Sequence, residues 1–223
     1  MRKDTLITRA KIISTAERLY AENGIDAVSL NEITREAEQK NKSALTYHFG
    51  GKEGLLKAII EKHLEGVLEQ LDDYLDDLEL QNAINLENVI RSVVYALAAK
   101  LDDEDGGRHC LSILAQLVSL NNRHSLSVNE FLGDNHRLMV TLQDLTDGTP
   151  EVLRSVRLMQ GSQMLFHSLS HLAIIMNKKP GTSPFRSHDH LNKVFIDSLV
   201  DSLVAIANIE PSQATQMALA EAG

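Results

Sequence analysis

A short stretch near the N-terminus, residues 42–49, combines side chains that hydrogen-bond with side chains that pack. On a helix, the polar side chains share one side, and these are Lys42, Ser43, Thr46 and Tyr47. The other side is mainly apolar and comprises Ala44, Leu45, His48 and Phe49. Lysine can bond O6 and N7 of guanine, and Ser or Thr hydroxyls can serve several bases. A helix that reads the major groove of DNA has these properties, although a surface helix of an enzyme can show the same division.

The residues around this stretch predict a helix, a tight turn and a second helix. Ser29 is a good N-cap, and Glu32 follows three residues later, which is the pattern of a capping box. An apolar stripe then marks a short helix and consists of Leu30, Ile33 and Ala37. The polar segment 38–41 interrupts the stripe, and the glycines at 50 and 51 end the second helix.

The segment resembles the DNA-binding head of the TetR family of bacterial transcriptional regulators. In that family an aromatic–His–Phe run closes the recognition helix, and a lysine three residues later opens the next helix. Here these residues are Tyr47-His48-Phe49 and Lys52, and the resemblance covers residues of about 5–65. In one departure, the turn between the two helices usually carries a glycine, whereas Glu38 follows Ala37 here.

The resemblance implies that double-stranded operator DNA is a partner. The family positions that match Tyr47 and His48 lie at the DNA surface, and the one that matches Lys52 binds phosphate at a helix N-terminus. The helical angle of His48 leaves a second interpretation, in which its ring faces the core of the head. The residues expected to contact DNA are Ser29, Lys42, Ser43, Ala44, Thr46, Tyr47, His48 and Lys52.

The net charge of −9 argues against DNA binding until it is divided along the chain. Residues 1–63 contain 11 Lys and Arg and 9 Asp and Glu, whereas residues 64–223 contain 11 and 22. Basic charge therefore lies with the helix-turn-helix, and an acidic body is expected to face away from DNA. A simpler interpretation is that most of these carboxylates only aid solubility.

The periodic apolar residues predict an all-α chain of about nine helices. We expect a three-helix head over residues 1–51, a helical regulatory and dimerisation domain over 52–210, and a loose tail over 211–223. The longest uninterrupted pattern, Lys52 to Leu80, predicts a helix about 40 Å long. Such a rod could act as a lever between head and body, although a plain core helix fits the same residues.

The sequence favours a cytoplasmic protein without a membrane segment. It has no run of 18 apolar residues, and its basic N-terminus lacks the apolar region of a signal peptide. The single cysteine, Cys110, excludes a disulfide framework and a Cys-based zinc site and is expected in the core.

Neither a metal nor catalysis is expected. His167 and His171 are spaced i, i+4 like a pair of metal ligands, but spacing fixes no third ligand, so an interface or pocket wall is the preferred location. The sequence contains no paired catalytic carboxylates, Gly-rich phosphate loop or Ser/His/Asp arrangement that would support an enzyme. No cofactor is expected.

Two predicted helices, residues 151–177 and 190–209, are apolar around much of their circumference and must be covered on several sides. Either the monomer covers them or a second copy does. In the TetR family the two corresponding helices form a four-helix dimer bundle, so the resemblance implies a homodimer. The expected interface residues are Leu165, Leu169, Leu172, Leu191, Phe195, Leu199 and Leu203.

The resemblance also implies a small-molecule site between the long helix and the body. Its expected lining comprises Leu64, Leu68, Leu114, Leu117, Met139, Met164 and Phe166. An apolar lining that contains methionine indicates a hydrophobic effector. The expected function is a repressor that such an effector releases from a palindromic operator. The alternative is a nucleoid-associated or protein-interaction module with the same fold and no small-molecule effector.

Overall fold

The computed structural model describes residues 3–39, 44–119, 137–177 and 189–222. Within these ranges the chain is helical and contains no strand, which confirms the predicted all-α class. The head contains α1 (Lys3–Asn23), α2 (Leu30–Glu36) and α3 (Ala44–Phe49). The body contains α4 (Lys52–Leu80), α5 (Leu86–Ala98), the 3₁₀ turn η1 (Ala99–Leu101), α6 (Gly107–Ser119), α8 (Arg137–Leu145), α9 (Glu151–Asn177), α10 (Asp189–Asn208) and α11 (Gln213–Ala222).

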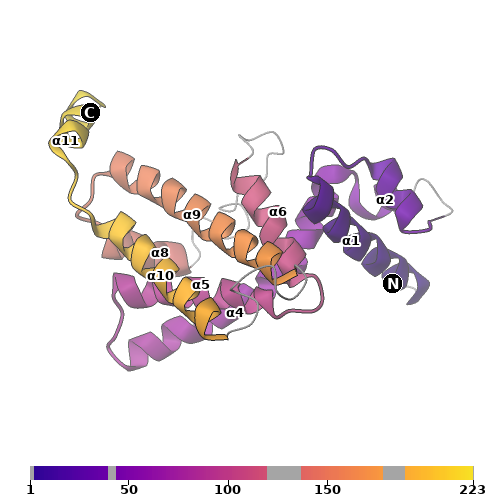
Figure 1. Cartoon of the computed structure of the whole chain (residues 1–223), viewed down its shortest axis with the longest axis horizontal. Helices are drawn as coiled ribbons and strands as arrows, with labels where there is room; N and C mark the ends of the chain where they lie inside the picture. The colour runs from indigo at the N-terminus through magenta and orange to yellow at the C-terminus, as the bar shows by residue number, and fades with distance from the viewer. Residues whose placement is uncertain (1–2, 40–43, 120–136, 178–188, 223) are drawn as a thin grey trace.

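The head lies at one end of the molecule (Figure 1). Its core is formed by apolar side chains from all three helices, such as Ile12, Ile33 and Leu45, each of which is fully buried. The head also packs outward: α1 contacts α4 and α6, and α3 contacts α4. A unit this small buries little area alone, so the body stabilises it.

Helix α4 connects this head to the body. Its 29 residues span about 43 Å. Buried leucines and isoleucines continue along it, from Leu55 beside the head to Leu75 near its far end. The predicted uninterrupted rod is therefore present with the predicted bounds.

In the body, α9 packs against α6 and α10, and α10 also packs against α5 (Figure 1). The shared core includes Leu169, Leu172 and Val200, none of which is exposed.

The C-terminal tail differs from the expected loose segment, because it contains helix α11. The backbone amide of Thr215 donates to the hydroxyl of Ser212, which caps the start of this helix. The residues that follow are mostly good helix formers such as alanine, glutamine and methionine. These local signals explain the helix, which brings the described α-helices to ten where about nine were expected.

A buried cluster of charged and polar groups joins head to body. Glu17 on α1 and His63 on α4 are each 1% exposed, and Glu17 Oε1 lies 2.9 Å from His63 Nε2. Lys62 donates to both oxygens of Glu17 at 3.2 Å and to the carbonyl of Asp105 at 2.8 Å. A Cβ added at Gly106, whose φ is +91°, would lie 2.5 Å from Glu17 Oε2. The Glu17 carboxylate therefore holds α1, α4 and the loop before α6 together.

We predict that Glu17→Ala lowers the free energy of unfolding by about 3–5 kcal/mol, because it leaves the partners of a buried charge without their acceptor. Urea denaturation followed by circular dichroism measures the change. Arg18→Ala is the matched control, since the neighbouring Arg18 makes an exposed ion pair with Glu22 that contributes about 0–1 kcal/mol. Equal losses in the two variants would show that the cluster does not stabilise the fold.

Candidate DNA-binding interface and body cavity

Helix α2 begins as the sequence predicts. Ser29 has the extended backbone of an N-cap, with φ −90° and ψ 153°, and its hydroxyl accepts from the Glu32 amide at 3.2 Å. At the other end, the amides of Glu38 and Gln39 donate to the carbonyls of Arg35 and Thr34. These bonds close the turn that leads toward α3.

Glu38 occupies the turn position at which the TetR pattern usually has glycine, and its φ is +53°. This left-handed conformation is favourable for glycine and strained for most other residues. The side chain of Glu38 pairs with the Lys11 ammonium of α1, and this hydrogen bond lowers the pKa of the Glu38 carboxyl. The departure in sequence thus keeps the backbone of the turn and adds a contact to α1.

Helix α3 presents two of the expected DNA contacts to solvent. Leu45 is buried against the head, whereas Thr46 is exposed and Tyr47 is 82% exposed. The half-buried His48 ring packs edge-on against Tyr47, with the ring centroids 5.2 Å apart. The His48 ring is thus neither fully at the exposed face expected to meet DNA nor fully in the core of the head. Lys42, Ser43 and the Ala44 side chain lie outside the part of the chain that is described.

Lys52, which the resemblance places at a DNA phosphate, is half-buried at the start of α4. Its ammonium donates to the Val28 carbonyl at 3.0 Å and lies 5.6 Å from the centroid of the Tyr20 ring. Desolvation by burial lowers the pKa of Lys52. The side chain therefore holds the loop that carries Ser29, a long-range role that local spacing does not reveal.

Gly54 allows α3 and α4 to meet closely. A Cβ at this position would lie 1.8 Å from the carbonyl oxygen of Phe49. The sequence did not single out Arg9, whose guanidinium lies 5.3 Å from the centroid of the Phe49 ring. Arg9 thereby places a positive charge beside the end of α3.

A cavity of about 1070 Å³ lies in the body between α4, α5, α6, α8, α9 and α10. Five of the expected lining residues border it: Leu64, Leu68, Leu117, Met139 and Phe166. Two expectations are corrected: Leu114 is buried in the core, and Met164 is 38% exposed at the surface of α9. Sequence spacing placed them on apolar helices without showing which side of each helix faces the cavity.

The expected dimer residues also need correction. Within the single chain, α9 and α10 bury five of them against neighbouring helices: Leu165, Leu169, Leu172, Leu199 and Leu203. Leu191 and Phe195 are half-buried. Apolar side chains that remain on the outside include Ile174, which is 49% exposed, and Val194, which is 63% exposed. A partner would therefore meet the outer faces of α9 and α10.

Two candidate residues outside the head, His167 and Cys110, contact other parts of the body. The ring nitrogen Nε2 of His167 lies 2.6 Å from the Ser119 hydroxyl, and burial raises the pKa of the Cys110 thiol to about 12.

Among the described residues, no group of three or more His, Cys, Asp or Glu side chains could hold a metal ion. None of the described helices is long and apolar enough to cross a membrane.

Comparison with known proteins identifies the head. Residues 12–59 match the family model described as bacterial regulatory proteins, tetR family. The HTH-type transcriptional regulator SAB2452 of Staphylococcus aureus is 30% identical over 108 residues, which cover 47% of this chain and 54% of that protein. The probable HTH-type transcriptional regulator YttP of Bacillus subtilis is 29% identical over 75 residues, covering 34% of this chain and 36% of that one. The matches thus span about half of the first relative and a third of the second.

A solved structure, Salmonella enterica GusR, shares the fold with a TM-score of 0.52 at 16% identity, covering 94% of this chain and 99% of that one. Helices α1–α3 and the matched residues define a helix-turn-helix DNA-binding domain on a helical body. Over these N-terminal residues the chain is similar to the tetR family of bacterial regulatory proteins.

We predict that Thr46→Ala reduces discrimination between cognate and mismatched DNA by roughly 1–3 kcal/mol, which is the loss expected if the exposed Thr46 hydroxyl contacts one base in the major groove. Fluorescence anisotropy on sites enriched from random-sequence DNA measures it. Thr15→Ala is the control, since the Thr15 hydroxyl donates to the Lys11 carbonyl within α1. An unchanged sequence preference in Thr46→Ala would show that this face of α3 does not read bases.

Proposed function

We propose that this chain is a homodimeric repressor that binds a palindromic operator in the cytoplasm, is released by a small hydrophobic effector and catalyses no reaction. The observation that carries the proposal is the continuity of α4, which takes part in both sites. Leu55 and Leu56, near its start, are fully buried beside the head, and Leu64 and Leu68 border the cavity. Only about 14 Å of helix separates Leu55 from Leu64.

The buried cluster supports this coupling. His63 precedes the cavity residue Leu64 and contacts Glu17 of α1. A molecule that displaces this part of α4 would therefore act on α1 of the head. It changes DNA binding only if it binds one arrangement of the heads more tightly than the other.

The test is a screen of hydrophobic compounds for release of enriched operator DNA, followed by calorimetry with and without operator. A coupling of about 1–3 kcal/mol would change affinity roughly 5- to 150-fold, and reciprocity requires the same factor in both directions. Footprinting that shows one or a few palindromic sites supports this function. Broad coverage of DNA, with equal effector affinity in both titrations, would favour the alternative module without an effector.

The outer faces of α9 and α10 support the dimer. His167, His171, Ile174 and Val194 are exposed there and leave a mixed apolar and polar surface. A two-fold partner would cover this surface with the same surface of its own.

We predict that the double variant Ile174→Asp and Val194→Asp is monomeric and keeps its helical content. Light scattering at micromolar concentration measures the mass. The matched control is Val140→Asp, since Val140 is 45% exposed on α8. Leu199→Asp tests something else, because Leu199 is buried inside the chain and its loss would unfold the core. A monomeric wild-type protein would overturn the dimer.

A further inference from the structure

The walls of the body cavity are unevenly polar. Most of the lining is aliphatic, including Leu64, Val67, Val94 and Leu97. Near the end of α8 and the start of α9 the wall is more polar, and Gln143, Thr146, Thr149, Glu151, Arg154 and Ser155 line it there. Further along α9 the polar side chains are Arg157, Ser162 and Gln163. A site that is largely apolar, with polar groups concentrated near one end, fits a ligand that is apolar along most of its length and polar at one end.

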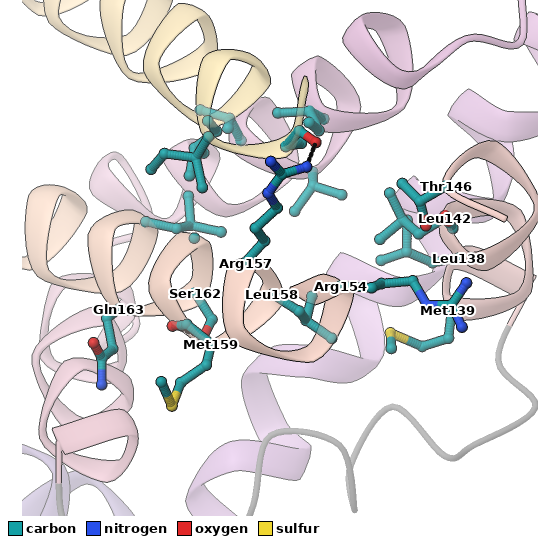
Figure 2. A pocket seen from close by; sticks show the side chains of 18 of the residues that line it. Leu138, Met139, Leu142, Thr146, Arg154, Arg157, Leu158, Met159, Ser162 and Gln163 are labelled. Atoms are coloured by element: carbon teal, nitrogen blue, oxygen red, sulfur yellow. Dashed lines mark hydrogen bonds between the residues drawn. The ribbon is translucent and has the colours of Figure 1, made fainter. Parts of the chain in front are cut away.

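Two arginines on α9 border the cavity, and their surroundings differ. Arg157 donates to the carbonyls of Ala207 and Ile209, so it satisfies the C-terminal end of α10. The backbone amide of Arg154 donates to the Pro150 carbonyl, but its guanidinium makes no hydrogen bond or ion pair with any residue in the described ranges. In Figure 2 its side chain extends from α9 toward Met139, Leu138 and Thr146 of the α8 region.

A guanidinium beside apolar walls is unfavourable unless an anion or water pairs with it. The carboxylate on the same wall, Glu151, is exposed in the first turn of α9, where the helix N-terminus itself stabilises a negative charge. No ion pair joins Glu151 to Arg154 in this structure, although both are described. Among the described residues that line this wall, Arg154 is thus the cation whose side chain has no partner within the chain.

We propose that the effector is an amphipathic acid, whose carboxylate pairs with Arg154 and whose long apolar chain fills the cavity. The inference rests on the proposed effector function and specifies its ligand class. Arginine binds a carboxylate through two parallel N–H donors, which adds orientation to affinity. From Arg154 to Phe166 the cavity follows α9 for about 18 Å, which gives room for an extended chain that reaches Leu68 of α4.

The experiment compares dodecanoate, dodecanol and dodecylamine on the full-length protein below their aggregation concentrations. Each displaces an environment-sensitive dye, and the loss of dye fluorescence reports binding. We expect dodecanoate to bind about tenfold or more tightly than the alcohol and the amine. In Arg154→Gln, dodecanoate should weaken by about tenfold while dodecanol is unchanged, and Arg154→Lys should recover part of the loss.

Two further variants complete the test. Arg91→Gln removes a half-buried arginine that pairs with Glu87 and Asp197 outside the cavity, and it should leave all three affinities unchanged. Leu68→Trp should fill the cavity and weaken acid and alcohol alike. Thermal melts establish that each variant is folded.

These outcomes distinguish the role of Arg154 from the existence of an effector cavity. Equal affinity for acid and alcohol, or no effect of Arg154→Gln, overturns the role of Arg154 and leaves a hydrophobic effector in place. Failure of the wild-type protein to bind either compound, or binding that Leu68→Trp does not weaken, overturns the effector cavity as well.

Discussion

The structure depends on one carboxylate buried between the DNA-binding head and the body. Glu17 accepts from Lys62 and contacts His63, so α1 cannot shift along α4 without separating charged groups from their partners. A buried charge that loses its partner is strongly destabilising, although the intact pair need not add much stability. Its main effect is therefore on specificity of position: it fixes how the head is oriented on the long helix. That orientation in turn decides where α3 lies relative to the body.

Much of the head could be predicted because its signals are local. The cap at Ser29, the stripe over α2 and the glycines after α3 act within a few residues, and the structure places each as expected. Glu38 shows a limit of this reasoning, since a non-glycine residue adopts the left-handed turn and gains Lys11 as a partner. Glu17 and Lys52 show another, because their partners lie 24 to 46 residues away and leave no periodic trace.

The body was less predictable for a related reason. A helix that is apolar on several sides does not show which side meets the chain's own core. Leu199 and Val194 both lie on α10, yet one is buried and the other is exposed. Likewise, Arg154 and Arg157 are one turn apart on α9, and only the structure shows that Arg157 donates to a carbonyl of α10. In both cases, two residues close together on one helix differ in their surroundings because only one of them contacts a helix distant in sequence.

The contact between Arg157 and the end of α10 bears on how an effector would act. Arg157 and Ala207 border the cavity and join α9 to the end of α10, while Leu64 and Leu68 border it from α4. A molecule in the cavity thus touches the helix that carries the head and the helix proposed to meet the partner. The spacing of two heads in a dimer depends on the angle between these elements in each protomer. In the proposed mechanism, a ligand that widens the cavity would change that angle directly, and no separate relay of small side-chain movements would be required, because packed helices shift as rigid units.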